Sequence, residues 1–271
     1  VGSLLLEIQE RIPQSSERKS FSSADNIYLL MPDRFCNGNS ANDNVKGMLE
    51  TTNRILKGGR HGGDLEGIEK HLEYFKDIGM TALWLNPVLE NNMPEYSYHG
   101  YAMTDLYKVD ARYGSNEEYQ QLSSRAKQMG IGIIMDQVAN HIGSYHPWIA
   151  NLPSEDWLNQ WEEFTPTNHM KVSRFDPHSA AIDQKVFHDG WFVSTMPDLN
   201  QRQPKLAKYL IQNSIWWIEY ADLYGIRMDT WSYPDKQFLA DWTKGILTEY
   251  PNFNIVGEEW VSDPSLISYW Q

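Results

Sequence analysis

Short apolar runs alternate with amphipathic segments along this chain. Five runs have the length and composition of buried strands, at 27–32, 81–87, 131–138, 225–229 and 254–260. Segments with helical periodicity precede three of these runs, over 65–78, about 115–129 and about 204–223. Strands that are apolar on both faces are typical of a parallel sheet covered by helices. The pattern therefore predicts an α/β fold.

Two long intervals interrupt this alternation. Residues 36–63 are rich in Asn and Gly, whereas residues 143–203 combine several prolines with many aromatic residues and lack a clean helical period. Loops of this length in a compact fold usually carry function. We expect the second interval to be an insertion at the carboxyl-terminal rim of the sheet.

Composition excludes some functions without choosing one. The 271 residues carry a net charge of −13, which disfavours a nucleic-acid partner because phosphate backbones are repelled. No apolar run approaches the roughly 18 residues that a membrane span requires. Cys36 is the one cysteine, so an intrachain disulfide is excluded. Aromatic residues make up 13% of the chain and can stack on sugar rings, although most such residues serve packing.

Charged residues stand where three of the predicted strands end: Asp136 in the third, Arg227 and Asp229 in the fourth, and a pair of glutamates in the fifth. In parallel β/α folds, active sites form at the carboxyl ends of the strands. Arg227 and Asp229 are two residues apart and share a strand face. We therefore expect the guanidinium to lower the pKa of Asp229 and keep it ionised, as a glycosyl nucleophile requires. A purely structural buried ion pair is the alternative.

The two glutamates, Glu258 and Glu259, are adjacent, so only one of them can face the same site. Either could in principle be the proton donor. A second carboxyl about 5–5.5 Å from the first is the arrangement of a retaining glycosidase. Repulsion from Asp229 and partial burial are expected to raise the pKa of this second carboxyl, as a general acid needs.

Three motifs carry a resemblance to a known family. The strings DQVANH at 136–141, GIRMD at 225–229 and GEEW at 257–260, in this order, resemble the hallmark segments of the α-amylase family of glycoside hydrolases. GMTALWLNP at 79–87, YHGY at 98–101 followed by Asp105, and MPDLN at 196–200 are also similar to family segments. The resemblance extends from about residue 26 to residue 260, and it is closest to neopullulanase and cyclomaltodextrinase-like enzymes.

The resemblance implies a (β/α)8 TIM barrel of which about the first five β/α units are present, with an inserted domain after the third strand. Residues 1–25 would be a linker or remnant of a preceding domain, and 26–142 would form units one to three with a calcium-loop excursion at 36–64. Residues 143–203 would form the inserted domain, and 204–271 would form units four and five. We expect the chain to be a fragment of a longer enzyme.

The resemblance also assigns roles to individual residues. Asp229 matches the nucleophile, Glu258 matches the general acid/base, and Arg227 matches the arginine beside the nucleophile. Glu259 would then point elsewhere. An acceptor sugar would stack on Trp231 or Tyr233, which stand where the family often has a basic residue. The remaining substrate-binding residues implied by the resemblance are His99, Tyr101, Asp136 and His141.

Calcium is the expected metal. Asn37, Asn39, Asn42 and Asp43 lie in one loop, and their oxygens suit a hard cation. The loop resembles the calcium loop of the neopullulanase subgroup, in which the carbonyl of Gly62 and the carboxylate of Asp64 would complete the shell. An Asn-rich turn without metal is the alternative.

The sequence thus favours a retaining α-glycosidase acting on α-1,4 and also α-1,6 glucosidic bonds of starch, pullulan, cyclodextrin or maltooligosaccharides. The family's third catalytic Asp, which follows a His, has no counterpart in the expected order, since His188-Asp189 precedes the nucleophile. We therefore expect the chain by itself to be inactive. The alternatives are a non-catalytic α-glucan-binding protein and a transglycosylase or isomerase of the same family.

The expected partner is an α-glucan, with no nucleic acid and no membrane span. The sequence leaves open whether the protein is a homodimer. It also leaves open the compartment, for which the resemblance suggests the bacterial periplasm, secretion or the cytoplasm.

Overall fold

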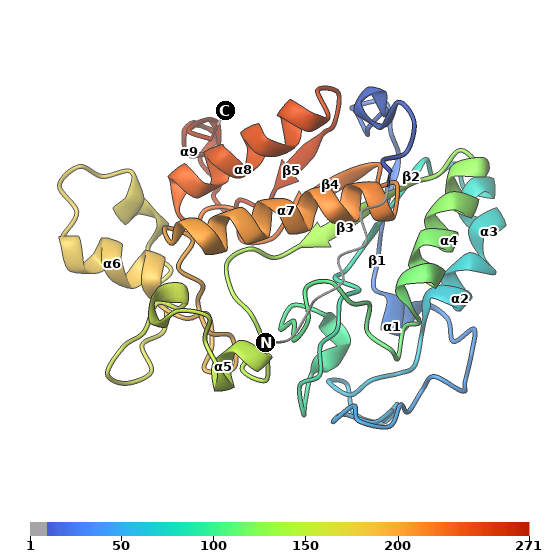
Figure 1. Cartoon of the computed structure of the whole chain (residues 1–271), viewed down its shortest axis with the longest axis horizontal. Helices are drawn as coiled ribbons and strands as arrows, with labels where there is room; N and C mark the ends of the chain where they lie inside the picture. Colours follow the sequence, from blue (N-terminus) through green and yellow to red (C-terminus); the bar gives the residue numbers. More distant parts are fainter. Residues whose placement is uncertain (1–9, 271) are drawn as a thin grey trace, which may run out of the picture.

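A five-stranded parallel sheet forms the centre of the computed structural model, which describes residues 10–270. The strands are β1 (Ile27–Leu30), β2 (Ala82–Leu85), β3 (Gly132–Gln137), β4 (Gly225–Met228) and β5 (Ile255–Gly257), paired in chain order (Figure 1). Each predicted strand is present but ends one or more residues before the end of its predicted run.

Long amphipathic helices cover one face of the sheet. They are α4 (Asn116–Gln128), α7 (Pro204–Tyr220) and α8 (Lys236–Glu249), and α7 and α8 lie side by side (Figure 1). Ser115 and Asp235 cap the amino-terminal ends of α4 and α8 with their side-chain oxygens. Fully buried Trp217 and Trp242 belong to the main hydrophobic core, which these helices share with the strands.

The helix predicted over 65–78 is wrong in one respect, because the segment forms two short helices. These are α2 (Leu65–Glu69) and α3 (Leu72–Asp77). The ring nitrogen Nδ1 of His71 lies 2.8 Å from the carbonyl oxygen of Gly67, which the His71 backbone would have bound in a continuous helix. The His71 N–H donates instead to the carbonyl of Ile68. A side chain thus replaces one backbone hydrogen bond and breaks the helix.

The insert at 143–203 lies at one end of the sheet (Figure 1). An isolated bridge between His141 and Asp198 joins it to the chain that follows β3. Asn140 also donates a hydrogen bond to Asp198 over 3.0 Å. The short helices of the chain, in the insert and elsewhere, are α1 (Pro32–Phe35), α5 (Pro147–Ala150), α6 (Ala181–Asp189), α9 (Pro264–Ser268), η1 (Ser15–Glu17), η2 (Ser97–His99), η3 (Glu155–Trp157) and η4 (Lys171–Arg174).

Residues 10–25 pack against the amino-terminal side of the sheet. Arg18 donates to the carbonyl of Ile218 at the end of α7, and Phe21 occupies the space that a side chain at Gly225 would need. The outer strands β1 and β5 leave Leu29 and Val256 54% and 44% exposed. The described part of the sheet is therefore an open arc. Among residues 10–270, no helix combines the length and the apolar character that a membrane span requires.

Candidate active site

Arg227 lies at the centre of a cluster of three carboxylates at the carboxyl ends of β3, β4 and β5. Its Nη1 is 2.7 Å from Oδ1 of Asp136 and 2.7 Å from Oδ1 of Asp229. Its Nη2 forms an ion pair with Oε1 of Glu258. The parallel register places Arg227 directly opposite Asp136. The carboxyl groups of Asp229 and Glu258 are thus held on one guanidinium, so the two strand ends converge as the sequence analysis predicted.

Two residues at the end of β2 complete the wall of this cluster, and sequence reasoning did not single them out. The indole of Trp84 donates to Oδ2 of Asp136 over 3.0 Å and lies under the Arg227 guanidinium, 5.1 Å from ring centre to carbon. Asn86 donates to the hydroxyl of Tyr101, which in turn donates to Asp136 over 3.1 Å. The signal was available, because alternate residues of a strand share one face.

A strained turn after the nucleophile candidate aims a backbone N–H at Glu258. Thr230 has a φ of 49°, which is rare for a β-branched residue. Its N–H donates to Oε2 of Glu258 over 3.0 Å, and the N–H of Trp231 donates to the Glu258 carbonyl. Strain of this kind costs on the order of 1–3 kcal/mol and persists where the surroundings determine the conformation. The turn therefore fixes the position of Glu258 relative to Asp229.

The pKa shifts expected for the two carboxyl groups are wrong. The pKa of Asp229 is raised rather than lowered, and that of Glu258 is lowered rather than raised. Burial, followed by the charge of Asp136, raises the pKa of Asp229 to about 8 against the opposing effect of Arg227. Burial alone would raise the pKa of Glu258, but the Thr230 N–H, Trp260, Arg227 and Asp229 together hold it below its ordinary value. One cation cannot balance three carboxylates. The raised pKa values of Asp229 and Asp136 therefore favour one proton shared within the cluster near neutral pH, with Asp229 as the stronger proton acceptor.

The predicted sugar-binding residues lie around the same cluster. His99 Nδ1 accepts a hydrogen bond from the N–H of Tyr101, and the two rings stack at 5.7 Å. His141 Nε2 lies 3.2 Å from the carbonyl oxygen of Tyr101, which assigns the proton to Nε2. Burial lowers the pKa of both histidines to about 4, so they are neutral at pH 7.

A groove of about 560 Å³ lies between the insert and the loop after β5. Tyr233, Lys171 and Trp260 line it, and Trp260 is 58% exposed. Of the two aromatic residues predicted to stack on an acceptor sugar, Tyr233 lines the groove but is only 3% exposed, and Trp231 does not line it. The indole of Trp231 lies where a side chain at Gly257 would stand, and it faces Trp242 of α8. Because residue 257 has no side chain, Trp231 packs there instead of lining the groove.

Glu259 points away from the cluster, as expected. Its Oε1 forms a 2.6 Å ion pair with Lys171 of the insert, and its Oε2 accepts from the indole of Trp270 over 2.9 Å. Lys171 is a third residue, after Trp84 and Asn86, that sequence reasoning did not single out. The pair joins the insert to the strand end that carries Glu258.

The string His188-Asp189 lies at the end of α6 and contributes nothing to the cluster. Asp189 pairs with Arg202 over 2.8 Å and with Lys185 over 3.3 Å. His188 Nδ1 lies 3.3 Å from the carbonyl oxygen of Tyr233. His188 and Asp189 thus lie outside the carboxylate cluster. This agrees with the sequence analysis, which did not accept them as the family's third catalytic Asp and its preceding His.

The predicted calcium loop brings Asn37, Asp43 and Gly62 together. The amide of Asn37 contacts Oδ1 of Asp43 over 2.5 Å, and a side chain at Gly62 would collide with that same oxygen. Oδ1 of Asn42 is buried without a hydrogen-bond partner among the described residues. Asp64 is engaged as the cap of α2 and accepts from three backbone N–H groups, those of Gly38, Asn39 and Gly67. The Asn39 side chain accepts from Ala41.

Comparison with known proteins agrees with this fold, which is that of a β/α-barrel glycoside hydrolase. A family model described as "Alpha amylase, catalytic domain" matches residues 29–271. Among curated proteins, the intracellular maltogenic amylase of Bacillus subtilis is 30% identical over 87% of this chain and 38% of its own length. The cyclomaltodextrinase of Thermoanaerobacter pseudethanolicus is 31% identical over 86% of this chain and 39% of its own length.

Among solved structures, the α-amylase of Geobacillus thermoleovorans in complex with acarbose has a TM-score of 0.73. It is 33% identical, over 94% of this chain and 50% of that one. An Anoxybacillus α-amylase has a TM-score of 0.77 at 31% identity, over 91% of this chain and 49% of that one. The chain belongs to the α-amylase family of glycoside hydrolases, and the predicted fold class is confirmed. This chain covers about two fifths of the length of each curated relative named above and about half of the length of each solved structure.

Proposed function

We propose that the protein of which this chain is part hydrolyses α-1,4-glucosidic bonds of maltooligosaccharides, starch or cyclodextrin, and also α-1,6 bonds, with retention of configuration. The observation that supports this most is the pair of carboxyl groups, Asp229 and Glu258, bound to one guanidinium at adjacent strand ends. Two carboxyl groups this close leave no room for a water molecule on the far side of the sugar, so a covalent route is favoured.

In the proposed reaction, Asp229 attacks the anomeric carbon while Glu258 protonates the departing glycosidic oxygen. The covalent glycosyl-enzyme is then hydrolysed by a water molecule that Glu258 deprotonates. The raised pKa of Asp229 favours a proton on that carboxyl near neutral pH. Moving it to Glu258 requires one transfer between two carboxyl groups that share Arg227. The buried Asp136 and the neutral His99 and His141 would hydrogen-bond the sugar at the cleavage position.

The configuration of the first product tests this proposal. Proton NMR during cyclodextrin or maltoheptaose cleavage by the natural full-length protein should show α-anomeric maltooligosaccharides before mutarotation. Initial β-anomers would contradict the covalent route. Products longer than the substrate would instead identify a transglycosylase, and a rearranged disaccharide would identify an isomerase. We expect little turnover from the 271-residue chain by itself, because the family's third carboxylate has no counterpart in it.

We further propose a structural Ca²⁺ in the loop at 36–64, held by oxygens of Asn37, Asn39, Asn42, Asp43, Gly62 and Asp64. The unpartnered oxygen of Asn42 and the close approach of Gly62 to Asp43 support a cation there. The ion would supply no chemistry to the cleaved bond. It would fix a loop that otherwise relies on the ion pair of Asp43 with Arg54, 3.1 Å apart.

Calcium removal should therefore lower the melting temperature of the chain. With Ca²⁺ at about 100 times its dissociation constant, the expected difference between calcium and EDTA samples is roughly 5–10 °C. Differential scanning calorimetry measures it, with Mg²⁺ as the control ion. Asp43→Asn should remove most of the difference. Equal melting temperatures with EDTA and with millimolar Ca²⁺ would contradict the proposal.

A further inference from the structure

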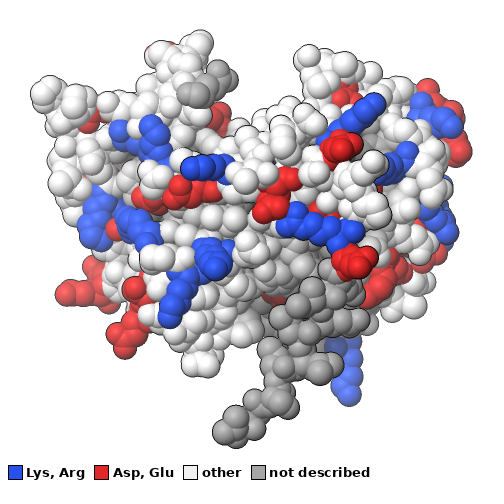
Figure 2. Space-filling view, turned by 45° about the horizontal axis from the view of Figure 1, so that its top comes forward, with Lys and Arg blue, Asp and Glu red and all other residues white. Residues whose placement is uncertain are grey.

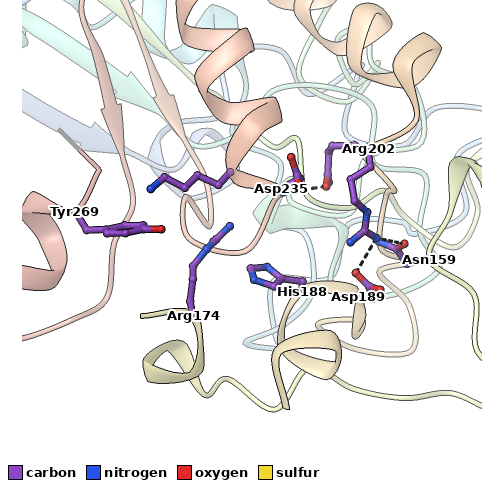
Figure 3. Close-up of a pocket in the computed structure, with 9 residues that line it drawn as sticks. Asn159, Arg174, His188, Asp189, Arg202, Asp235 and Tyr269 are labelled. Carbon is purple, nitrogen blue, oxygen red and sulfur yellow. Dashed lines mark hydrogen bonds and ion pairs between the residues drawn. The ribbon is translucent and has the colours of Figure 1, made fainter. Parts of the chain in front are cut away.

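A second cavity, of about 200 Å³, lies between the insert and the start of α8, apart from the carboxylate cluster. Figure 3 shows Arg174 and His188 of the insert on one side, Tyr269 on another and Arg202 with Asp189 at the far end. The cavity touches the segment that carries Tyr233, because Arg174 donates to the carbonyl of Pro234 over 3.0 Å.

The carboxylates around this cavity are already engaged. Asp189 is paired with Arg202 and Lys185. Asp235 uses Oδ1 to cap α8, accepting from the N–H of Phe238 over 2.9 Å. Of the three cations that line the cavity, Arg202 is paired, whereas Arg174 and Lys236 have no carboxylate partner within ion-pair distance among the described residues.

The guanidinium of Arg174 is the more informative of the two cations. Its Nη1 is buried and has no hydrogen-bond partner in the part of the chain that the structure describes. Burial lowers the pKa of Arg174 to about 10, against weaker opposing effects of Tyr269, Asp235 and Glu259. A buried donor without an acceptor is costly, and a charged donor is costlier still. Among the described residues, Nη1 of Arg174 therefore lacks an acceptor, and the guanidinium as a whole lacks an ion-pair partner.

Lys236 lies close to Arg174 around the same aromatic residues. Its Nζ is 3.4 Å from the ring centre of Tyr269 and 5.8 Å from that of Trp270, while the Arg174 guanidinium carbon is 4.7 Å from the Trp270 ring. Lys236 is also the first residue of α8, a helix of 14 residues. The partial positive charge of a helix amino terminus adds to that of the two side chains.

This positive lining contrasts with the rest of the molecule. The chain carries a net charge of −13, and on the face shown in Figure 2 basic side chains are interspersed with acidic ones. The aromatic residue that lines the cavity, Tyr269, already has the Lys236 ammonium over its ring. The volume corresponds to several water molecules, which suits a small ion better than an oligosaccharide.

We propose that this cavity binds a small oxyanion, of which inorganic phosphate is the simplest, between Arg174 and Lys236. The oxyanion would supply counter-charge to the Arg174 guanidinium and form charge-assisted hydrogen bonds with both cations that line the cavity. It would lie beside residues 233–235, because Arg174 contacts the Pro234 carbonyl and Asp235 lines the cavity. The site does not depend on the proposed glucan chemistry.

Isothermal titration of the 271-residue chain with sodium phosphate, in a zwitterionic buffer at pH 7 and constant ionic strength, tests the proposal. Wild-type protein should bind one phosphate per chain. Arg174→Gln and Lys236→Gln should each weaken binding by about tenfold or more, because each removes a charge-assisted hydrogen bond. Arg125→Gln, an equal change of charge on α4, should leave the affinity unchanged.

Lys236 is exposed at the rim, so its variant should fold even if Arg174→Gln does not, and circular dichroism checks both. Sulfate should compete with phosphate, whereas maltose should not. Absence of phosphate binding by the wild type would overturn the proposal. Equal affinity in Lys236→Gln and Arg125→Gln would overturn it as well.

Discussion

Substituting Asp229 by Asn should lower the kcat for maltooligosaccharide hydrolysis in the natural full-length protein by on the order of 10⁴-fold or more. An amide is a poor nucleophile and cannot form the covalent glycosyl-enzyme. The change is nearly isosteric, and Arg227 keeps its ion pairs with Asp136 and Glu258. The loss should therefore appear in kcat while the affinity for substrate changes little. Steady-state kinetics on maltoheptaose provides the measurement.

Asp241→Asn is the matched control, because Asp241 lies exposed on α8, where it accepts from Gln237. Its kcat should equal that of the wild type. A normal kcat in Asp229→Asn would remove Asp229 from the reaction and with it the proposed mechanism. Loss of activity together with loss of the folded circular dichroism signal would instead show a structural role.

The second large effect concerns stability, and it follows from the same carboxylate. The free energy of unfolding of the 271-residue chain should fall as the pH rises from 5 to 8. The pKa of Asp229 is raised from its ordinary value of 3.8 to about 8 in the folded protein. The folded state therefore binds this proton more tightly than the unfolded state, so the stabilisation is complete below pH 4 and is lost as the pH approaches 8.

The expected loss is on the order of 5 kcal/mol if Asp229 titrates alone, and it is shared with Asp136 because the two groups are coupled. Burial raises the pKa of Asp136 to about 6, so its effect has the same sign. Glu258 has a lowered pKa and acts only on the acid side, below this window. Urea unfolding at pH 5, 6, 7 and 8 measures the trend.

Asp229→Asn should flatten this dependence, since an amide loses no proton, and the variant should be more stable than the wild type at pH 8. Asp241→Asn should keep the wild-type slope. Parallel curves for the wild type and Asp229→Asn would show that Asp229 is ionised across the whole range. A variant that is more stable but inactive would show that the cluster reduces stability in favour of chemistry.

The cluster is costly because one guanidinium serves three carboxylates. Removing charges from water costs free energy that their mutual attraction recovers only in part. The protein offsets some of this cost with neutral donors, among them the Trp84 indole, the Tyr101 hydroxyl and the Thr230 N–H. These donors explain how a buried site with excess negative charge persists in the folded chain.

The sequence by itself determined the sheet and the convergence of the carboxylates. Strands buried on both faces must be apolar throughout, so their runs are visible without a structure. Parallel strands end at one edge, so Asp136, Arg227, Asp229 and Glu258 had to meet there. The two-residue period of a strand also placed Arg227 and Asp229 on one face. Each of these inferences depends on local geometry.

Only the tertiary structure decided which group holds the proton, which aromatic residue lines the groove and where helix 65–78 breaks. The pKa of Asp229 depends on burial and on Asp136, which is distant in sequence, so the effect of the adjacent Arg227 was not decisive. Trp231 packs on Gly257 and left the groove to Tyr233 and Trp260. Electrostatics and packing sum over neighbours in space, and a linear pattern does not identify those neighbours.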